Sequence, residues 1–324
     1  MAWTAWSGTH RPQPRSAREG LSRAGPAAVE AAVRASYAAH AARERSTIEP
    51  PALLGAPDSL DARRHWRMYE RLRLLVQADP AASWLTIGDS GADAAALRRL
   101  GAHHVLASSL SAAPLRELAR RGFLDGVEIL ELNAERLDRL DRPIDYLLCK
   151  EAYHHFPRPP IAFYGFLETA RRAVALIEPV DMGRRFPLDV LRSLAKRWIR
   201  GDPPERLLFE DWGNNIFRLS LPEVDRMLTA LQVESWYVAC HNDFYHPRLS
   251  PRPTGDRLAD SIERLAVAVQ DLAAGLGLMG YGKAAVVVPT GGIPRAAAEG
   301  LLCQGFRERL TARNPWVPAP AGAA

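Results

Sequence analysis

The sequence predicts an α/β protein with a doubly wound, mostly parallel seven-stranded sheet. From Ser83 onward, short apolar runs alternate with helical segments, as in successive βαβ units. The runs are apolar throughout rather than alternating with polar residues, which is typical of strands covered by helices on both faces. At 324 residues, 47% hydrophobic and 24% charged, the chain is long and apolar enough for a closed core.

Helix-capping residues and the spacing of apolar residues predict the individual helices and strands. Asp58 or Ser59 can cap a first helix, in which an apolar stripe recurs at steps of three and four residues up to Pro80. Ser220 and Glu223 form a capping box that opens a late helix. The expected strands are Trp84–Ile87, His104–Ala107, Val127–Leu132, Asp145–Cys149, Ala173–Ile177, Val233–Ala239 and Ala284–Val288. The helices expected between them include Ala94–Leu100, Ser111–Gly122 and Ser220 to about Leu231.

These elements predict one domain over residues 58–295, with a substrate-covering insertion around residues 182–280. Residues 1–57 are expected to form an N-terminal tail, in which the first 25 residues are disordered, Ala27–Glu44 is a helix and a proline-rich linker follows. Residues 296–324 are expected to be a C-terminal tail.

Composition excludes several classes of protein. The net charge of +5 belongs largely to the tails: residues 1–50 hold seven Arg against four Glu, whereas residues 51–295 hold 32 basic against 31 acidic residues. This distribution argues against a nucleic-acid interface. No apolar run is long enough for a membrane span, and three widely spaced cysteines favour reduced thiols and a cytoplasmic protein.

Polar residues follow the expected strands at the edge where ligands bind in such sheets. They are Gly88–Gly91, Ser108–Ser109, Asn133–Glu135, Lys150–His155 and Glu178–Asp181. In this order and spacing, Trp84–Asp89, Asn133–Glu135, Cys149–Pro159 and Leu176–Pro179 resemble a bacterial group of class I, type 11-like S-adenosylmethionine (SAM) dependent methyltransferases. The resemblance runs from about Trp84 to Asp181, and its most specific part is Cys149–Pro159.

The resemblance implies the Rossmann-like methyltransferase fold and SAM as the cofactor. The glycine loop would receive the methionyl end, residues after the second strand the ribose, and residues after the third strand the adenine. The implied cofactor-binding residues are Gly88, Asp89, Ser90, Gly91, Ser108, Ser109, Asn133, Ala134, Glu135 and Lys150. The implied catalytic residues are Glu151, His154 and Glu178, although each glutamate could equally cap the turn that follows it.

Two departures from the family pattern affect this same cofactor. The loop at Gly88–Ala94 is two residues shorter and has one glycine fewer, and Ser109 stands where the family usually has Asp. A serine replaces a charge-assisted hydrogen bond to the ribose with a neutral one. A methyltransferase-like scaffold that has lost SAM binding is therefore the alternative to an active enzyme.

The predicted acceptor is a small polar organic molecule, which could contain a sugar or be a secondary metabolite, methylated on oxygen, nitrogen or carbon. Segments Arg184–Phe186, Trp212–Asn215 and His241–His246 are expected to cover it. Methyl transfer needs no metal, and the adjacent pair His154–His155 lacks a third ligand at helical spacing. The loop at Gly88–Gly91 also lacks the G-x-G-x-x-G pattern of a nicotinamide-dinucleotide site, and Ser109 stands where such a site would have an acidic residue.

Overall fold

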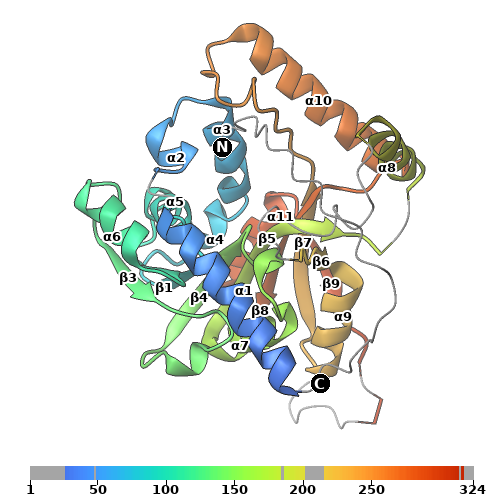
Figure 1. Ribbon diagram of the computed structural model, residues 1–324. Coiled ribbons are helices and arrows are strands. Elements are labelled where there is room, and N and C mark those ends of the chain that lie inside the picture. Colours follow the sequence, from blue (N-terminus) through green and yellow to red (C-terminus); the bar gives the residue numbers. More distant parts are fainter. Residues whose placement is uncertain (1–25, 47–48, 184–185, 201–214, 314, 317–324) are drawn as a thin grey trace.

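The computed structural model describes residues 26–46, 49–183, 186–200, 215–313 and 315–316 (Figure 1). Its strands are β1 (Ser83–Ile87), β2 (His104–Ser109), β3 (Val127–Glu131), β4 (Ile144–Lys150), β5 (Ala170–Asp181), β6 (Leu219–Ser220), β7 (Ser235–His241), β8 (Lys283–Pro289) and β9 (Arg307–Leu310). Its helices are α1 (Pro26–Ser46), α2 (Ala52–Gly55), α3 (Leu60–Glu70), α4 (Arg73–Gln77), α5 (Ala92–Leu100), α6 (Ala113–Arg120), α7 (Pro159–Thr169), α8 (Pro187–Arg200), α9 (Leu221–Ala230), α10 (Arg257–Gly275) and α11 (Arg295–Cys303), with 3-10 turns η1 (Leu137–Arg139) and η2 (Tyr153–His155).

The strands form one sheet in the order β3-β2-β1-β4-β5-β8-β7-β9, and β6 pairs with β5 beside this path. Strands β1 to β5 are parallel, whereas β8 is antiparallel to both β5 and β7. The expected doubly wound, mostly parallel α/β sheet is confirmed, with the two short strands β6 and β9 in addition to the seven expected. Strand order reverses between β1 and β4, which leaves a crevice at their carboxyl ends.

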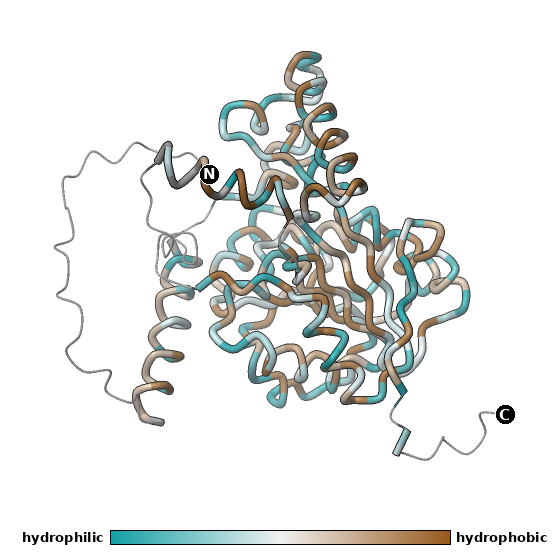
Figure 2. The backbone as a smooth tube through the Cα atoms, turned by 90° about the vertical axis from the view of Figure 1, so that its right-hand side faces the viewer, coloured by the Kyte–Doolittle hydropathy of each residue, from teal (hydrophilic) through white to brown (hydrophobic). Residues whose placement is uncertain are grey.

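Two apolar layers bury the sheet, because neighbouring residues of each strand point to opposite faces. Trp84 packs with α3, α4, α5 and α11 on one face, whereas the adjacent Leu85 packs with α7 and α9 on the other. Figure 2 shows the strands as the most hydrophobic part of the chain, which is why their sequences read as uninterrupted apolar runs.

The expected helix caps are present. Ser59 Oγ accepts a hydrogen bond from the Ala62 amide at 3.1 Å, and Ser220 Oγ accepts one from the Glu223 amide at 3.4 Å. The apolar stripe that follows Ser59 is divided between α3 and α4, which are separated at Arg71 and Leu72.

Both ends of the chain contribute more to the fold than the sequence indicates. Helix α1 extends over the predicted range, and it contacts α6 and lines a pocket together with Gly88 and Ala134. Within the expected C-terminal tail, α11 packs against α4 and β9 pairs with β7. The expected disorder of residues 1–25 concerns positions outside the described residues. Across the described ranges, the helices lack the length and apolarity that a membrane span requires.

Gly291 follows β8 at a point where the backbone approaches that of β5. A Cβ atom at this position would overlap the carbonyl oxygen of Arg171, and backbone atoms cannot move aside as a flexible side chain can. We expect Gly291→Ala to lower the free energy of unfolding in urea by more than about 2 kcal/mol. In α7, a Cβ on Gly165 meets nothing within 4 Å, so the control Gly165→Ala should stabilise the protein by up to about 1 kcal/mol. Equal stability of the two variants would contradict this packing.

Candidate cofactor and active site

A cleft of about 540 Å³ opens at the carboxyl ends of β1, β2 and β4. Its floor includes Gly88 and Ser90 after β1, Ser109 at the end of β2 and Glu151 after β4. Helices α1, α3, α5 and α6 contribute its walls. The cleft therefore lies at the reversal of strand order, where the topology predicts a ligand.

The loop from β1 to α5 is held by the carboxylate of Asp89. Gly88 and Gly91 have φ angles of +66° and +93°, which the absence of a side chain permits. The Asp89 side chain is buried, and it accepts hydrogen bonds from the amides of Gly91, Asp93 and Ala94 at 2.7, 3.1 and 2.9 Å. These are the amides at the start of α5 that we expected to face the methionyl carboxylate. Asp89 instead uses them itself, while Gly88 and Ser90 line the cleft.

The residues after β2 and β3 differ in what they contact. Ser109 is buried and lines the cleft, whereas Ser108 Oγ donates to the carbonyl of Thr86 at 2.6 Å and ties β2 to β1. Asn133 Oδ1 accepts from the Glu135 amide at 2.8 Å, which closes the turn after β3. The Glu135 carboxylate receives the backbone amide and Nε of Arg158 at 3.0 and 2.7 Å. The side chains of Ser108, Asn133 and Glu135 are thus engaged within the protein, and their part in cofactor binding stays a prediction.

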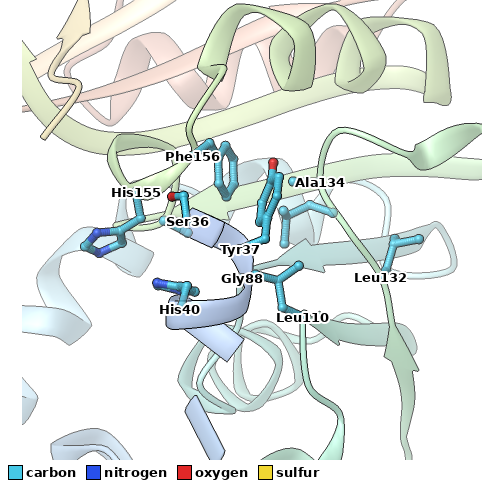
Figure 3. A pocket seen from close by; sticks show the side chains of 11 residues that line it. Ser36, Tyr37, His40, Gly88, Leu110, Leu132, Ala134, His155 and Phe156 are labelled. Carbon is cyan, nitrogen blue, oxygen red and sulfur yellow. The ribbon is translucent and has the colours of Figure 1, made fainter. Parts of the chain in front are cut away.

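Tyr37 of α1 fills the space beside Ala134, where the resemblance would put the adenine. Figure 3 shows its ring projecting from α1 toward Ala134 and Phe156. A volume of only about 20 Å³ remains in this slot. Burial and the nearby Glu135 carboxylate raise the pKa of the Tyr37 hydroxyl, so it stays neutral. The sequence predicted the helix, but nothing in its pattern indicated that it lines the site.

Glu178 and His154 form a pair at the edge of the cleft. Glu178 is completely buried in β5, and its Oε1 accepts the amides of Ala152 and Tyr153 at 2.8 and 2.9 Å. Its Oε2 lies 2.7 Å from Nδ1 of His154, which lines the cleft. The carboxylate thus fixes both the loop after β4 and the orientation of the imidazole ring, an arrangement typical of an oriented base. Both sequence-based alternatives for Glu178, a turn cap and a catalytic group, are compatible with this geometry.

Glu151 lies in a separate ionic cluster. Its Oε2 is 2.8 Å from Nζ of Lys150 and 3.4 Å from Nδ1 of His65, and its Oε1 contacts Nζ of Lys283. Burial alone would raise the pKa of this carboxyl, but Lys150 and Lys283 outweigh it and hold the pKa well below its usual range. Burial and the adjacent Lys150 lower the pKa of His65 to about 2, so its ring is neutral.

The cluster extends to the wall of the cleft and constrains the backbone. Arg64 of α3 pairs with Asp243 at 2.7 Å, and Asp243 lies 3.3 Å from Lys283. Glu151 has a φ of +52°, a left-handed conformation that few residues other than glycine adopt. A carboxylate stabilised by two ammonium groups is a weak base. The contacts of Glu151 therefore favour a structural role, in which it holds the wall of the cleft together, over a role as a base. Its catalytic role stays a prediction.

Asp93, which the sequence did not single out, is buried at the floor of the cleft. Its Oδ1 accepts a hydrogen bond from the Tyr69 hydroxyl of α3 at 2.5 Å. Burial and the neighbouring Asp89 carboxylate raise its pKa to about 8. The spacing of apolar residues in the first helix predicts that Tyr69 lies in the core, but only the tertiary structure brings its hydroxyl to Asp93.

Within the described ranges, no group of three or more His, Cys, Asp or Glu side chains could hold a metal ion. Of the expected covering segments, residues 184–185 and 212–214 lie outside these ranges.

No protein-family model matches the chain, and no curated protein matches it. The similar solved structures include magnesium protoporphyrin IX methyltransferase from Synechocystis PCC 6803 with bound S-adenosylhomocysteine (SAH), at 13% identity and a TM-score of 0.47 over 80% of this chain and 99% of that one. A plantazolicin methyltransferase with bound SAH is 13% identical, with a TM-score of 0.42 over 81% of this chain and 99% of that one. The fold class rests on the strand order and direction described above.

Asp93 makes the stability of the protein depend on pH. The folded protein keeps the Asp93 proton up to about pH 8, whereas the unfolded chain releases it near the ordinary value of 3.8. The native state thus binds one more proton between these values, and its stability falls as pH rises through this window, by up to about 1.4 kcal/mol per unit. We expect Asp93→Asn, which cannot titrate, to flatten this fall in urea unfolding between about pH 5 and pH 8. The exposed control Asp125→Asn should keep it. An unchanged slope in Asp93→Asn would show that the carboxyl is ionised in the folded protein.

Proposed function

We propose that the chain is a SAM-dependent methyltransferase that methylates an oxygen, nitrogen or carbon of a small polar organic acceptor. One observation carries this proposal: a single cleft contains both the glycine loop after β1 and a histidine oriented by a buried carboxylate. Its volume of about 540 Å³ falls within the range of small-molecule sites. The motif resemblance at Cys149–Pro159 supports SAM as the cofactor.

The residues around the cleft fit SAM if α1 can move. Gly88 and Ser90 line the cleft where the methionyl end would lie, and Ser109 lines it where the ribose would lie. The adenine would take the slot beside Ala134 after Tyr37 leaves it. SAM supplies a methyl group already activated by its sulfonium, so the protein needs mainly to position the acceptor and exclude water.

His154 is the group that can receive a proton from an oxygen or nitrogen acceptor. With Nδ1 protonated and donating to Glu178, the lone pair of the imidazole lies on Nε2. Glu178 positions this ring and stabilises the imidazolium that proton transfer would create. Lys150 and Glu151 neutralise one another and hold the adjoining wall.

Two features favour the alternative of a non-catalytic scaffold. Asp89 already occupies the amides at the start of α5, and Tyr37 already fills the adenine slot. A chain that had lost the cofactor could keep both contacts without cost. Cofactor binding is therefore the measurement that separates the two functions.

We expect the protein to bind SAH in calorimetry, and Tyr37→Ala to tighten this binding by roughly tenfold. The reason is that the competent state is populated only when Tyr37 is displaced, and removing the ring raises that fraction. Tyr164→Ala, on the exposed side of α7, is the matched control and should leave affinity unchanged. Absence of SAH binding in all three proteins would establish the scaffold instead of the enzyme.

For the catalytic pair, we expect His154→Ala to lower turnover on the order of a hundredfold while SAH affinity changes less than about threefold. Turnover is measured as transfer from radiolabelled SAM to the best acceptor in a panel of small polar compounds. Glu178→Gln keeps an oxygen for the backbone amides but removes the charge, so it should shift the pH profile of kcat. The exposed His103→Ala is the control. Full activity of His154→Ala would exclude this residue from the reaction.

A further inference from the structure

Asp93 has a carboxyl oxygen that the hydrogen bonds of the protein leave over. The side chain is 4% exposed, and it lines the cleft together with Gly88 and Ser90, where the methionyl end of SAM would lie. Its Oδ1 accepts the hydroxyl of Tyr69 at 2.5 Å. Within the described ranges, Oδ2 of Asp93 has no hydrogen-bond partner. Since buried polar atoms are almost always hydrogen-bonded, this oxygen points to a ligand in the cleft.

The charge at the start of α5 decides which part of a ligand can approach Asp93. Asp89 and Asp93 place two carboxyl groups there, and Asp89 already accepts three backbone amides of this turn. A carboxylate of the ligand beside Asp93 would be repelled by both groups, whereas an ammonium would be attracted by both. The methionyl end of SAM carries one group of each kind, so this wall of the cleft favours the ammonium.

A structural role in α5 does not account for Asp93. An ionised Asp in the first turn stabilises a helix through the helix dipole, but a neutral carboxyl contributes little in this way. The titratable and charged groups around Asp93 come from α3, from the loop before α5, and from β4 and the residue after it: Tyr69, Asp89, Cys149, Lys150 and Glu151. Burial and Asp89 outweigh Lys150 and raise the pKa of Asp93 to about 8, so at neutral pH the carboxyl carries its proton.

We propose that Asp93 binds the methionyl ammonium of the cofactor and releases its proton to solvent when that group binds. The inference rests on the proposed function, because the ammonium belongs to SAM or SAH. The exchange is balanced: a neutral carboxyl and an ammonium ion become a carboxylate–ammonium pair, and one proton leaves. The pair is held by a charge-assisted hydrogen bond, which is stronger than a bond to the neutral acid.

Tyr69 allows the carboxyl to change charge without moving. Its hydroxyl can donate to Oδ1 whether Asp93 is neutral or ionised, and Oδ2 is the oxygen that exchanges its proton for the ammonium. Below about pH 8 the protein must give up this proton before the pair can form. The affinity for the cofactor therefore rises with pH, by up to about tenfold per unit, and levels off above about pH 8.

Calorimetry of SAH binding in buffers of different ionisation enthalpy counts the protons released. At about pH 6.5 we expect the wild type to release nearly one proton, and its affinity to rise between about pH 5.5 and pH 7.5. Asp93→Asn keeps an oxygen for Tyr69 but cannot titrate, so it should release none and show a flat pH profile. Above about pH 8 it should bind SAH at least about tenfold more weakly than the wild type. The exposed control Asp125→Asn should behave as the wild type does.

Two analogues of SAH identify the group that displaces the proton. The analogue without the α-amino group should bind at least about tenfold more weakly and release no proton. The analogue without the carboxylate keeps the ammonium and should release the proton as SAH does. The measurements on the wild type need no variant, and a circular dichroism spectrum confirms that Asp93→Asn is folded.

The outcomes separate this inference from the proposed function. SAH binding without proton release overturns the role of Asp93 and leaves the methyltransferase proposal standing. Equal proton release in Asp93→Asn and the wild type does the same, as does equal release by SAH and its analogue without the amino group. Absence of SAH binding at every pH overturns both the proposed function and the role of Asp93.

Discussion

The carboxylate of Glu151 connects the two halves of the sheet at the cleft. Lys150 ends parallel β4, Lys283 begins antiparallel β8, and both ammonium groups bind this carboxylate. Two ammonium groups so close together in a poorly solvated interior would repel one another strongly without it. His65 of α3 contacts the same group, so the cleft wall, the end of β4 and the antiparallel strands all depend on one charge balance. The left-handed backbone of Glu151 is consistent with a position fixed by its surroundings.

Two side chains of the protein occupy positions that the proposal assigns to parts of SAM. Asp89 supplies a carboxylate to the start of α5, and Tyr37 supplies an aromatic ring to the slot beside Ala134. Each group has the chemistry of the part of SAM expected there, an anion at a helix N-terminus and a flat ring in an apolar slot. The ring belongs to α1, which lies outside the sheet, whereas the carboxylate belongs to the loop itself. The shortened loop therefore constrains the methionyl end of a cofactor more than the adenine end.

Three carboxyl groups around the cleft, of which Glu178 and Asp93 are buried and Glu151 is partly buried, carry out different tasks because their neighbours differ. Glu178 receives amides and an imidazole, Glu151 receives two ammonium groups, and Asp93 receives a hydroxyl beside a second carboxylate. Of the three, Glu178 is the one that contacts His154, the proposed proton acceptor in the cleft. Glu151 is held ionised, whereas burial next to Asp89 keeps Asp93 protonated. Residue type alone does not distinguish these roles.

The sequence by itself determined the seven main strands, their alternation with helices, the caps at Ser59 and Ser220 and the set of residues at the strand ends, because these depend on local periodicity and turn chemistry. It could not decide which polar groups at those ends meet the ligand and which bind one another, since that depends on contacts between residues far apart in the chain. Pairing of Lys283 with Glu151 and insertion of Tyr37 beside Ala134 are such contacts. Only the tertiary structure decided them, because the free energy of a charge or an aromatic ring depends on the surroundings into which the fold brings it.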